Sequence, residues 1–145
     1  MGDKQQNMLI AIGKIETQVG HIVAQSAFYA TDPWGFKSDN RFLNACLAVE
    51  TSLTPRQLLR ATQRIERAMG RTKKSCGTYH DRIIDIDILL YDDSIVNQPD
   101  LKIPHPLMHQ RLFVLQPLAE IAQNVIVPGS NISVGEMLKA LAAAS

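Results

Sequence analysis

The order of the hydrophobic patterns constrains the fold of this chain more than any other feature. Apolar residues recur at helical spacing over residues 4–19, where Asp3 stands at the N-cap position. A second amphipathic pattern covers residues 55–70, with Thr54 as its cap and Pro55 at the first helical position. The sequence therefore predicts two helices that each bury one face.

Segments with strand character follow each of these helices. Residues 21–31 are rich in β-branched and aromatic side chains, and residues 41–51 alternate between a purely apolar face and a second face that includes Cys46. Residues 82–91 read as a third strand, and prolines divide the rest into short pieces before a final helix over residues 134–144. This order indicates an α+β fold with two helices on one face of a mostly antiparallel sheet.

Length and charge exclude several classes of protein. The 145 residues suit a single domain spanning residues 1–145, and 15 Lys and Arg against 14 Asp and Glu leave a net charge of only +1. Such a balance disfavours a nucleic-acid or membrane-surface binder. We expect a cytoplasmic protein because the sequence has neither a secretion signal nor an apolar run of membrane-spanning length. Cys46 and Cys76 are expected to be free thiols.

The strongest chemical signal is the pair Asp85 and Asp87. Alternate residues of a strand share a face, so their Cα atoms would lie about 6–7 Å apart while the neighbouring isoleucines point into the core. Two adjacent carboxylates repel each other, and a divalent cation such as Mg²⁺ with phosphate oxygens relieves that repulsion. An acidic exposed strand face is the alternative interpretation.

A second group of residues is cationic. A basic stretch over residues 70–81 has the length of an active-site lid. The cations that could clamp a phosphate group are Arg71, Lys73, Lys74, Arg82, His105 and Arg111. The alternative is a solvated basic loop.

Phe42 and Asn44 place a flat ring beside a planar amide on one strand face. That pair suits a flat heteroaromatic ligand, which would stack on the ring and bond to the amide. The alternative is an aromatic side chain packed under the loop at residues 33–35. Because the sequence has no Walker-type glycine loop, a nucleotide would have to be held in another way.

Taken together, these motifs resemble the 6-hydroxymethyl-7,8-dihydropterin pyrophosphokinase family over residues 2–122. The matching motifs are Phe-Leu-Asn (42–44), Gln-Arg-Ile-Glu (63–66), Gly-Arg (70–71), Asp-Arg-Ile-Ile-Asp-Ile-Asp-Ile-Leu-Leu-Tyr (81–91), Ile-Pro-His-Pro (103–106) and Arg-Leu-Phe-Val (111–114). The resemblance implies a ferredoxin-like α+β fold. It also implies the transfer of pyrophosphate from ATP to the pterin hydroxymethyl group, with release of AMP, in folate biosynthesis.

The resemblance assigns a role to each matching residue. Asp85 and Asp87 would hold Mg²⁺ ions that bridge the ATP phosphates. The residues implied to contact the triphosphate are the catalytic Arg71 and Arg82, with Lys73, His105 and Arg111. Those implied to line the nucleoside are Leu59, Gln63, Glu66, Ile88 and Lys102. Those implied to bind the pterin are Phe42 and Phe113, which would sandwich it, with Asn44 and the backbone around Thr31, Asp32 and Trp34.

The sequence departs from the family pattern in two places. His80 and Asp81 precede Arg82 where the family has Gly-Pro, which leaves open the aromatic contact of this loop, with Tyr79 as the candidate. The family also opens with a strand and a Gly-Ser/Thr-Asn-Leu-Gly-Asp turn, of which only Gly-Asp remains at residues 2–3. We therefore expect the sheet to lack an interior strand. Either the natural chain begins further upstream, or residues 125–131 replace that strand.

Two other functions fit parts of the pattern. A truncated, catalytically silent module that binds a pterin or a nucleotide would keep the same residues. An RNA-binding module shares the general layout, but the net charge of +1 and the paired aspartates argue against it. The sequence predicts no oligomeric state.

Overall fold

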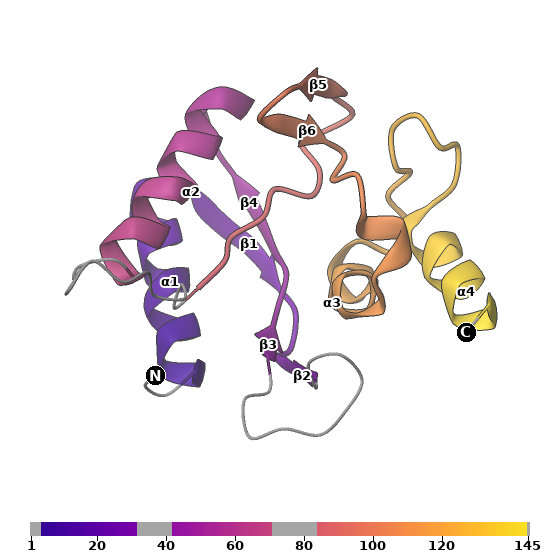
Figure 1. The fold of residues 1–145 in the computed structure, drawn as a ribbon, viewed down its shortest axis with the longest axis horizontal. Helices are drawn as coiled ribbons and strands as arrows, with labels where there is room; N and C mark the ends of the chain where they lie inside the picture. Colours follow the sequence, from indigo (N-terminus) through magenta and orange to yellow (C-terminus); the bar gives the residue numbers. More distant parts are fainter. Residues whose placement is uncertain (1–3, 32–41, 71–83, 145) are drawn as a thin grey trace. The chain divides into compact units, whose positions relative to one another are not determined.

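The structure is a computed structural model that describes residues 4–31, 42–70 and 84–144 (Figure 1). Its helices are α1 (Lys4–Gln18), α2 (Pro55–Gly70), α3 (Leu112–Ala122) and α4 (Val134–Ala144), with a short 3-10 turn, η3 (Met108–Gln110), before α3. Within these described ranges, every helix is too short or too polar to cross a membrane.

The strands of the described residues pair two by two. They are β1 (His21–Gln25) with β4 (Leu47–Glu50), β2 (Tyr29–Thr31) with β3 (Phe42–Asn44), and β5 (Val96–Gln98) with β6 (Leu101–Ile103). The second and third pairs are antiparallel. The predicted α+β class is therefore confirmed, with small sheets.

The chain divides into two compact units. The first consists of Met1–Ile22 and Val49–Asp87, and the second of Val23–Ala48 and Ile88–Ser145. The chain passes from one unit to the other within β1 and within β4.

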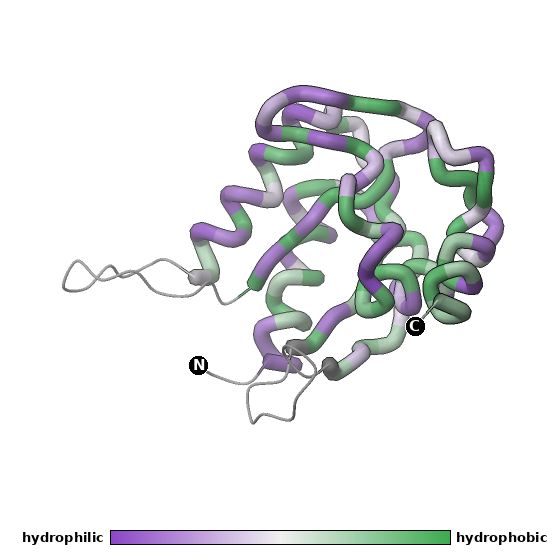
Figure 2. The backbone as a smooth tube through the Cα atoms, turned by 45° about the vertical axis from the view of Figure 1, so that its right-hand side comes forward, coloured by the Kyte–Doolittle hydropathy of each residue, from purple (hydrophilic) through white to green (hydrophobic). Residues whose placement is uncertain are grey.

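In the first unit, α1 packs against α2 as their amphipathic patterns predict. Hydrophilic and hydrophobic residues alternate along α2 (Figure 2), and its buried Ile65 belongs to the same unit as the buried Ile15 of α1. Thr54 and Gln57 cap α2 reciprocally, because the backbone N–H of each donates to the side-chain oxygen of the other, at 2.9 and 3.2 Å. Both predicted helices are confirmed, and Asp3 lies outside the described residues.

The turn from α1 into β1 depends on close backbone approach. A Cβ atom at Gly20 would collide with the carbonyl oxygen of Glu50, so only glycine fits. Glu16 closes the same turn, since its carboxylate accepts bonds from the Ile22 N–H at 3.0 Å and from the His21 ring at 3.1 Å. These bonds lower the pKa of Glu16, the backbone bond most.

The predicted strands over residues 21–31 and 41–51 are each interrupted. Three residues, 26–28, separate β1 from β2, whereas two, 45–46, separate β3 from β4. The extra residue is the signature of a β-bulge. Buried Ser26 joins the two sides, because its N–H donates to the Cys46 carbonyl and its Oγ accepts the Cys46 N–H, both at 2.9 Å.

Cys46 corrects the predicted strand faces. Alternation places it opposite the apolar face, but it lies in the interruption between β3 and β4 and is buried in the core of the second unit. It is a free thiol, as expected, and burial raises its pKa to about 11. Cys76 lies outside the described residues.

The second unit has its core between α3, α4 and η3. Its buried cluster consists of Cys46, Met108, Leu115, Leu118, Val127, Val134 and Met137. Ser133 and Glu136 cap α4 reciprocally, through backbone bonds of 2.8 and 3.1 Å. The final helix is therefore confirmed.

The strand predicted at residues 82–91 is wrong over its described part, residues 84–91, which form no ladder. Its polar groups bond elsewhere: the Ile86 N–H donates to the Glu66 carboxylate at 2.6 Å, and the Leu89 carbonyl accepts the His105 N–H at 2.9 Å. A strand needs successive bonds to one partner. The alternation of exposure persists nevertheless, because Asp85 and Asp87 are exposed and Ile86 is half-buried.

Residues 125–131 form a turn before α4. Ile126 bridges Ser133, and Val127 bonds to the Ile132 carbonyl at 2.9 Å. Because these bonds stay local, the segment joins none of the strand pairs of the described residues.

Candidate functional site

The paired aspartates flank a backbone amide that α2 holds in place. Glu66, near the end of α2, accepts the Ile86 N–H at 2.6 Å, and the carboxylates of Asp85 and Asp87 are exposed on either side of it. Among the described residues, no group of three or more His, Cys, Asp or Glu could form a metal site. The pair alone nevertheless fits Mg²⁺, which usually binds one or two carboxylates and takes its other ligands from water and phosphate.

Glu66, which bonds to this acidic segment, shares one face of α2 with two other predicted site residues. Leu59, Gln63 and Glu66 are spaced i, i+4 and i+7, so they follow one side of the helix. Leu59 and Glu66 are half-buried and Gln63 is exposed. The face offers both apolar contact and hydrogen bonds, which is what the predicted nucleoside contact requires.

In the second unit, His105 follows β6 and has a defined tautomer. The Leu107 N–H donates to His105 Nδ1 at 3.2 Å, so in the neutral ring the proton lies on Nε2. The half-buried imidazole can then donate from Nε2 to an anion. This geometry suits the predicted phosphate contact.

Arg111 and Phe113 stand together at the start of α3. Arg111 is the N-cap residue, and its guanidinium carbon lies 5.7 Å from the centroid of the Phe113 ring. This is a cation–π contact. Phe113 is 40% exposed, so a predicted phosphate contact and a predicted pterin contact meet at one accessible place.

The other described pterin residues lie on β2 and β3. Thr31 is paired with Phe42, and Tyr29 with the half-buried Asn44. Helix α3 contacts both strands. The elements that carry Phe42, Asn44 and Phe113 are therefore neighbours within one unit.

Two predicted nucleoside residues also belong to the second unit. Ile88 is half-buried, and Lys102 is exposed on β6. The Lys102 ammonium donates to Asn97 Oδ1 at 3.0 Å and to the Gln98 carbonyl at 3.2 Å. Lys102 therefore braces its own hairpin.

Several predicted residues lie outside the described part of the chain. They are Asp32, Trp34, Arg71, Lys73, Lys74, Tyr79 and Arg82.

Sequence reasoning missed Glu120. Its carboxylate accepts the Ala27 N–H at 2.6 Å and the Tyr29 hydroxyl at 2.8 Å, and so connects α3 to the start of β2. Glu120 is the single charged residue in the otherwise uncharged sequence of α3. That isolated charge is the signal that could have identified it.

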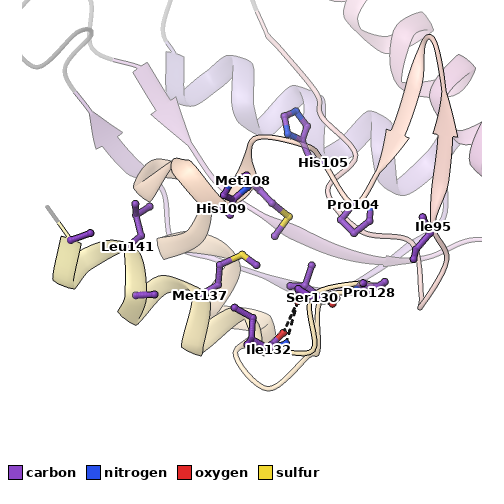
Figure 3. Close-up of a pocket in the computed structure, with 14 residues that line it drawn as sticks. Ile95, Pro104, His105, Met108, His109, Pro128, Ser130, Ile132, Met137 and Leu141 are labelled. Atoms are coloured by element: carbon purple, nitrogen blue, oxygen red, sulfur yellow. Dashed lines mark hydrogen bonds between the residues drawn. The ribbon is translucent and has the colours of Figure 1, made fainter.

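A pocket of about 690 Å³ opens in the second unit (Figure 3). The side chains of Met108 and Met137 point toward one another across it, and His105 lies at its edge. Its walls are mostly apolar and include none of the acidic residues. All of the residues that line it belong to the second unit.

Comparison with known proteins confirms the predicted family. Residues 1–123 match the model of the 7,8-dihydro-6-hydroxymethylpterin-pyrophosphokinase (HPPK) family. The chain is 48% identical over 124 residues to a 2-amino-4-hydroxy-6-hydroxymethyldihydropteridine pyrophosphokinase of Porphyromonas gingivalis, covering 84% of each chain. It is also 39% identical over 133 residues to the enzyme of that name from Methylorubrum extorquens, covering 91% of this chain and 83% of the relative. Similarity to the Bacillus subtilis enzyme is 39% over 126 residues, covering 86% and 74%.

Proposed function

The chain belongs to the HPPK family, and we propose on this basis that it transfers pyrophosphate from ATP to the hydroxymethyl group of 6-hydroxymethyl-7,8-dihydropterin. The products are AMP and the pterin pyrophosphate, an intermediate of folate biosynthesis. The observation that carries the proposal most directly is the exposed pair Asp85 and Asp87, flanking the amide that Glu66 anchors.

Asp85 and Asp87 are the residues that would hold Mg²⁺ with ATP. When bound, the metal neutralises phosphate charge and orients the triphosphate. The protein contributes a segment whose midpoint is tied to α2, so the two carboxylates are presented together. Preorganised ligands lower the cost of assembling such a site.

Phosphate charge would also be met by cationic and imidazole groups. His105 would donate from Nε2, and Arg111 would offer a guanidinium at the start of α3. Arg71, Lys73 and Arg82 complete the proposed triphosphate contacts. The proposed nucleoside contacts are Leu59, Gln63, Glu66, Ile88 and Lys102.

On the pterin side, Phe42 and Phe113 would sandwich the ring, while Asn44 and the backbone around Thr31, Asp32 and Trp34 read its edge. The hydroxymethyl oxygen then attacks the β-phosphorus in line, and AMP leaves. The protein forms no covalent intermediate in this scheme. Its residues position the two substrates and compensate charge.

We further propose that residues 1–145 act as one pyrophosphokinase domain with the ferredoxin-like layering of the family, in the cytoplasm. The crossing of β1 and β4 from one compact unit to the other supports one domain, because neither unit contains a complete copy of these strands. This interdependence predicts a single cooperative unfolding transition.

The deciding experiment measures AMP release from ATP in the presence of Mg²⁺, with and without 6-hydroxymethyl-7,8-dihydropterin. We expect AMP release that depends on the pterin and disappears when EDTA removes the metal. Pterin binding without turnover would instead identify the silent binding module. If the folded chain shows no turnover and does not bind the pterin, both functions are contradicted.

A further inference from the structure

The proposed pterin site has two walls, helix α3 and the β2–β3 pair. The carboxylate of Glu120 joins them. Glu120 Oε1 accepts the Ala27 N–H at 2.6 Å, and Oε2 accepts the Tyr29 hydroxyl at 2.8 Å. Ala27 lies in the bulge, and Tyr29 is the first residue of β2. Glu120 itself belongs to α3, and all these residues are in the second unit.

Glu120 and Phe113 share one side of α3. Seven residues make nearly two turns, so the two side chains leave the same face about 10 Å apart along the axis. Glu120 therefore holds the bulge with the face of α3 that also carries the ring proposed to stack on the pterin.

Tyr29 links Glu120 to strand β3. It is paired directly with Asn44 across the β2–β3 ladder, and Phe42 is paired with Thr31 two positions further along. Because a ladder moves as a unit, fixing Ala27 and Tyr29 also fixes the position of β3 relative to α3.

The bulge explains why a carboxylate is needed here. An extra residue in one strand leaves a backbone group without a ladder partner, and the Ala27 N–H finds its acceptor in Glu120. A charged acceptor makes a stronger hydrogen bond than a neutral one. Two such bonds from a single carboxylate restrict both the distance and the angle between α3 and the strands.

We propose that Glu120 is a positioning residue that sets the spacing between Phe113 on α3 and the strand that carries Phe42 and Asn44. This inference rests on the proposed function, since it assigns these elements to the pterin. Removing the carboxylate should weaken pterin binding selectively, because Glu120 bonds to Ala27 and Tyr29, which lead into the β2–β3 pair that carries the proposed pterin residues.

The test compares Glu120→Ala, Glu120→Gln and Tyr29→Phe with wild type. We would measure the Kd of the hydroxymethyl pterin by calorimetry in the presence of Mg²⁺ and a non-hydrolysable ATP analogue, and the Kd of the analogue alone. Lys139→Ala is the control, since it truncates an exposed side chain on α4 of the same unit. Thermal unfolding of each variant reports whether the fold is kept.

We expect Glu120→Ala to raise the pterin Kd about tenfold, as for loss of a charge-assisted hydrogen bond, with a change below about twofold for the ATP analogue. Glu120→Gln should restore part of the affinity, because an amide oxygen can still accept the Ala27 N–H. Tyr29→Phe, which deletes a single hydroxyl, should give a smaller rise in the same direction.

Equal losses for pterin and ATP analogue, or wild-type pterin affinity in all three variants, would overturn the positioning role. If Glu120→Ala does not fold, the two conservative variants decide. A wild-type protein that turns over the pterin while the variants bind it normally would refute this inference alone. A wild type that neither binds nor turns over the pterin would refute the proposed function, and this inference with it.

Discussion

The two units share one kind of contact, a hydrogen bond from a backbone N–H to a helix carboxylate, but the backbone that it holds differs. In the first unit, Glu66 of α2 accepts the backbone N–H of Ile86, and in the second, Glu120 of α3 accepts that of Ala27, each at 2.6 Å. In both places a helix supplies the acceptor for an amide that lies outside a regular ladder. A carboxylate can therefore stabilise irregular backbone where a sheet cannot.

The two regions differ in what the anchored backbone presents. The segment tied to Glu66 carries the exposed Asp85 and Asp87, and its backbone forms no strand. The bulge tied to Glu120 leads into a paired strand, and a second bond to Tyr29 strengthens the connection. In the proposed function, the first anchor holds the segment with the proposed metal ligands, and the second sets the spacing between α3 and the β2–β3 pair.

The strongest test of this comparison removes the ligand set and keeps its anchor. Asp85→Ala or Asp87→Ala should lower kcat about a thousandfold, because loss of a metal ligand removes several kcal/mol of charge stabilisation. Thermal unfolding should be unchanged or slightly improved, since carboxylate repulsion is relieved. Asp93→Ala, in an exposed turn, is the control. Near-normal AMP release by either variant at saturating Mg²⁺ would contradict the assignment.

Arg111 tests whether the second region also contributes to phosphate chemistry. Arg111→Ala should lower kcat about a hundredfold, as expected when a well-placed donor to developing charge is lost. Arg111→Lys should recover part of the rate, because it keeps the charge without the planar fork. Arg60→Ala, exposed on α2, should leave steady-state kinetics unchanged. If Arg111→Ala changed only the pterin KM, its contact with Phe113 would be its main role.

A substitution of Glu66 tests the hydrogen bond that holds the Ile86 amide. Glu66→Ala leaves the part-buried Ile86 N–H without this acceptor, which should cost about 1–3 kcal/mol of unfolding free energy. We expect the KM for ATP to rise about tenfold and the KM for the pterin to stay near wild type. Denaturant unfolding and steady-state kinetics measure both effects, with Glu50→Gln as the control. A larger effect on the pterin than on ATP would reverse the comparison between the two regions.

The smallest expected effect is on alkaline stability. The hydrogen bond to Glu120 is the main cause that raises the pKa of Tyr29 above its ordinary 10.0. The resulting stabilisation is fully present below pH 10 and is lost as the pH rises through the raised value. Melting curves across this range should therefore decline more in wild type than in Tyr29→Phe. An unchanged spectroscopic titration of Tyr29 in Glu120→Gln would contradict this linkage.

Local sequence signals predicted α1, α2 and α4 because the determinants of these helices are local. Thr54 with Gln57 and Ser133 with Glu136 lie three residues apart, and each pair satisfies amides at its own helix start. Apolar spacing then specifies which side is buried, as Ile65 illustrates. Nothing distant is needed to place these elements.

The strands were predicted less well because alternation does not specify pairing. Residues 84–91 keep the expected burial of a strand, yet their bonds come from a helix carboxylate and a loop amide. The sequence pattern also did not predict the bulge at residues 26–28, because an extra residue changes the pairing of a ladder without changing its composition. The burial of Cys46, which lies in the interruption between β3 and β4, was likewise not predicted.

By itself, the sequence determined the family, the helices α1, α2 and α4, and the exposed pair of aspartates, since each depends on residue types at short spacing. Only the tertiary structure decided which carboxylates anchor backbone. Glu120 and Ala27 lie 93 residues apart, and no periodic pattern relates them. Such a bond forms because folding brings an unpaired amide to a helix that can supply an acceptor, and that need arises only once the strands have paired.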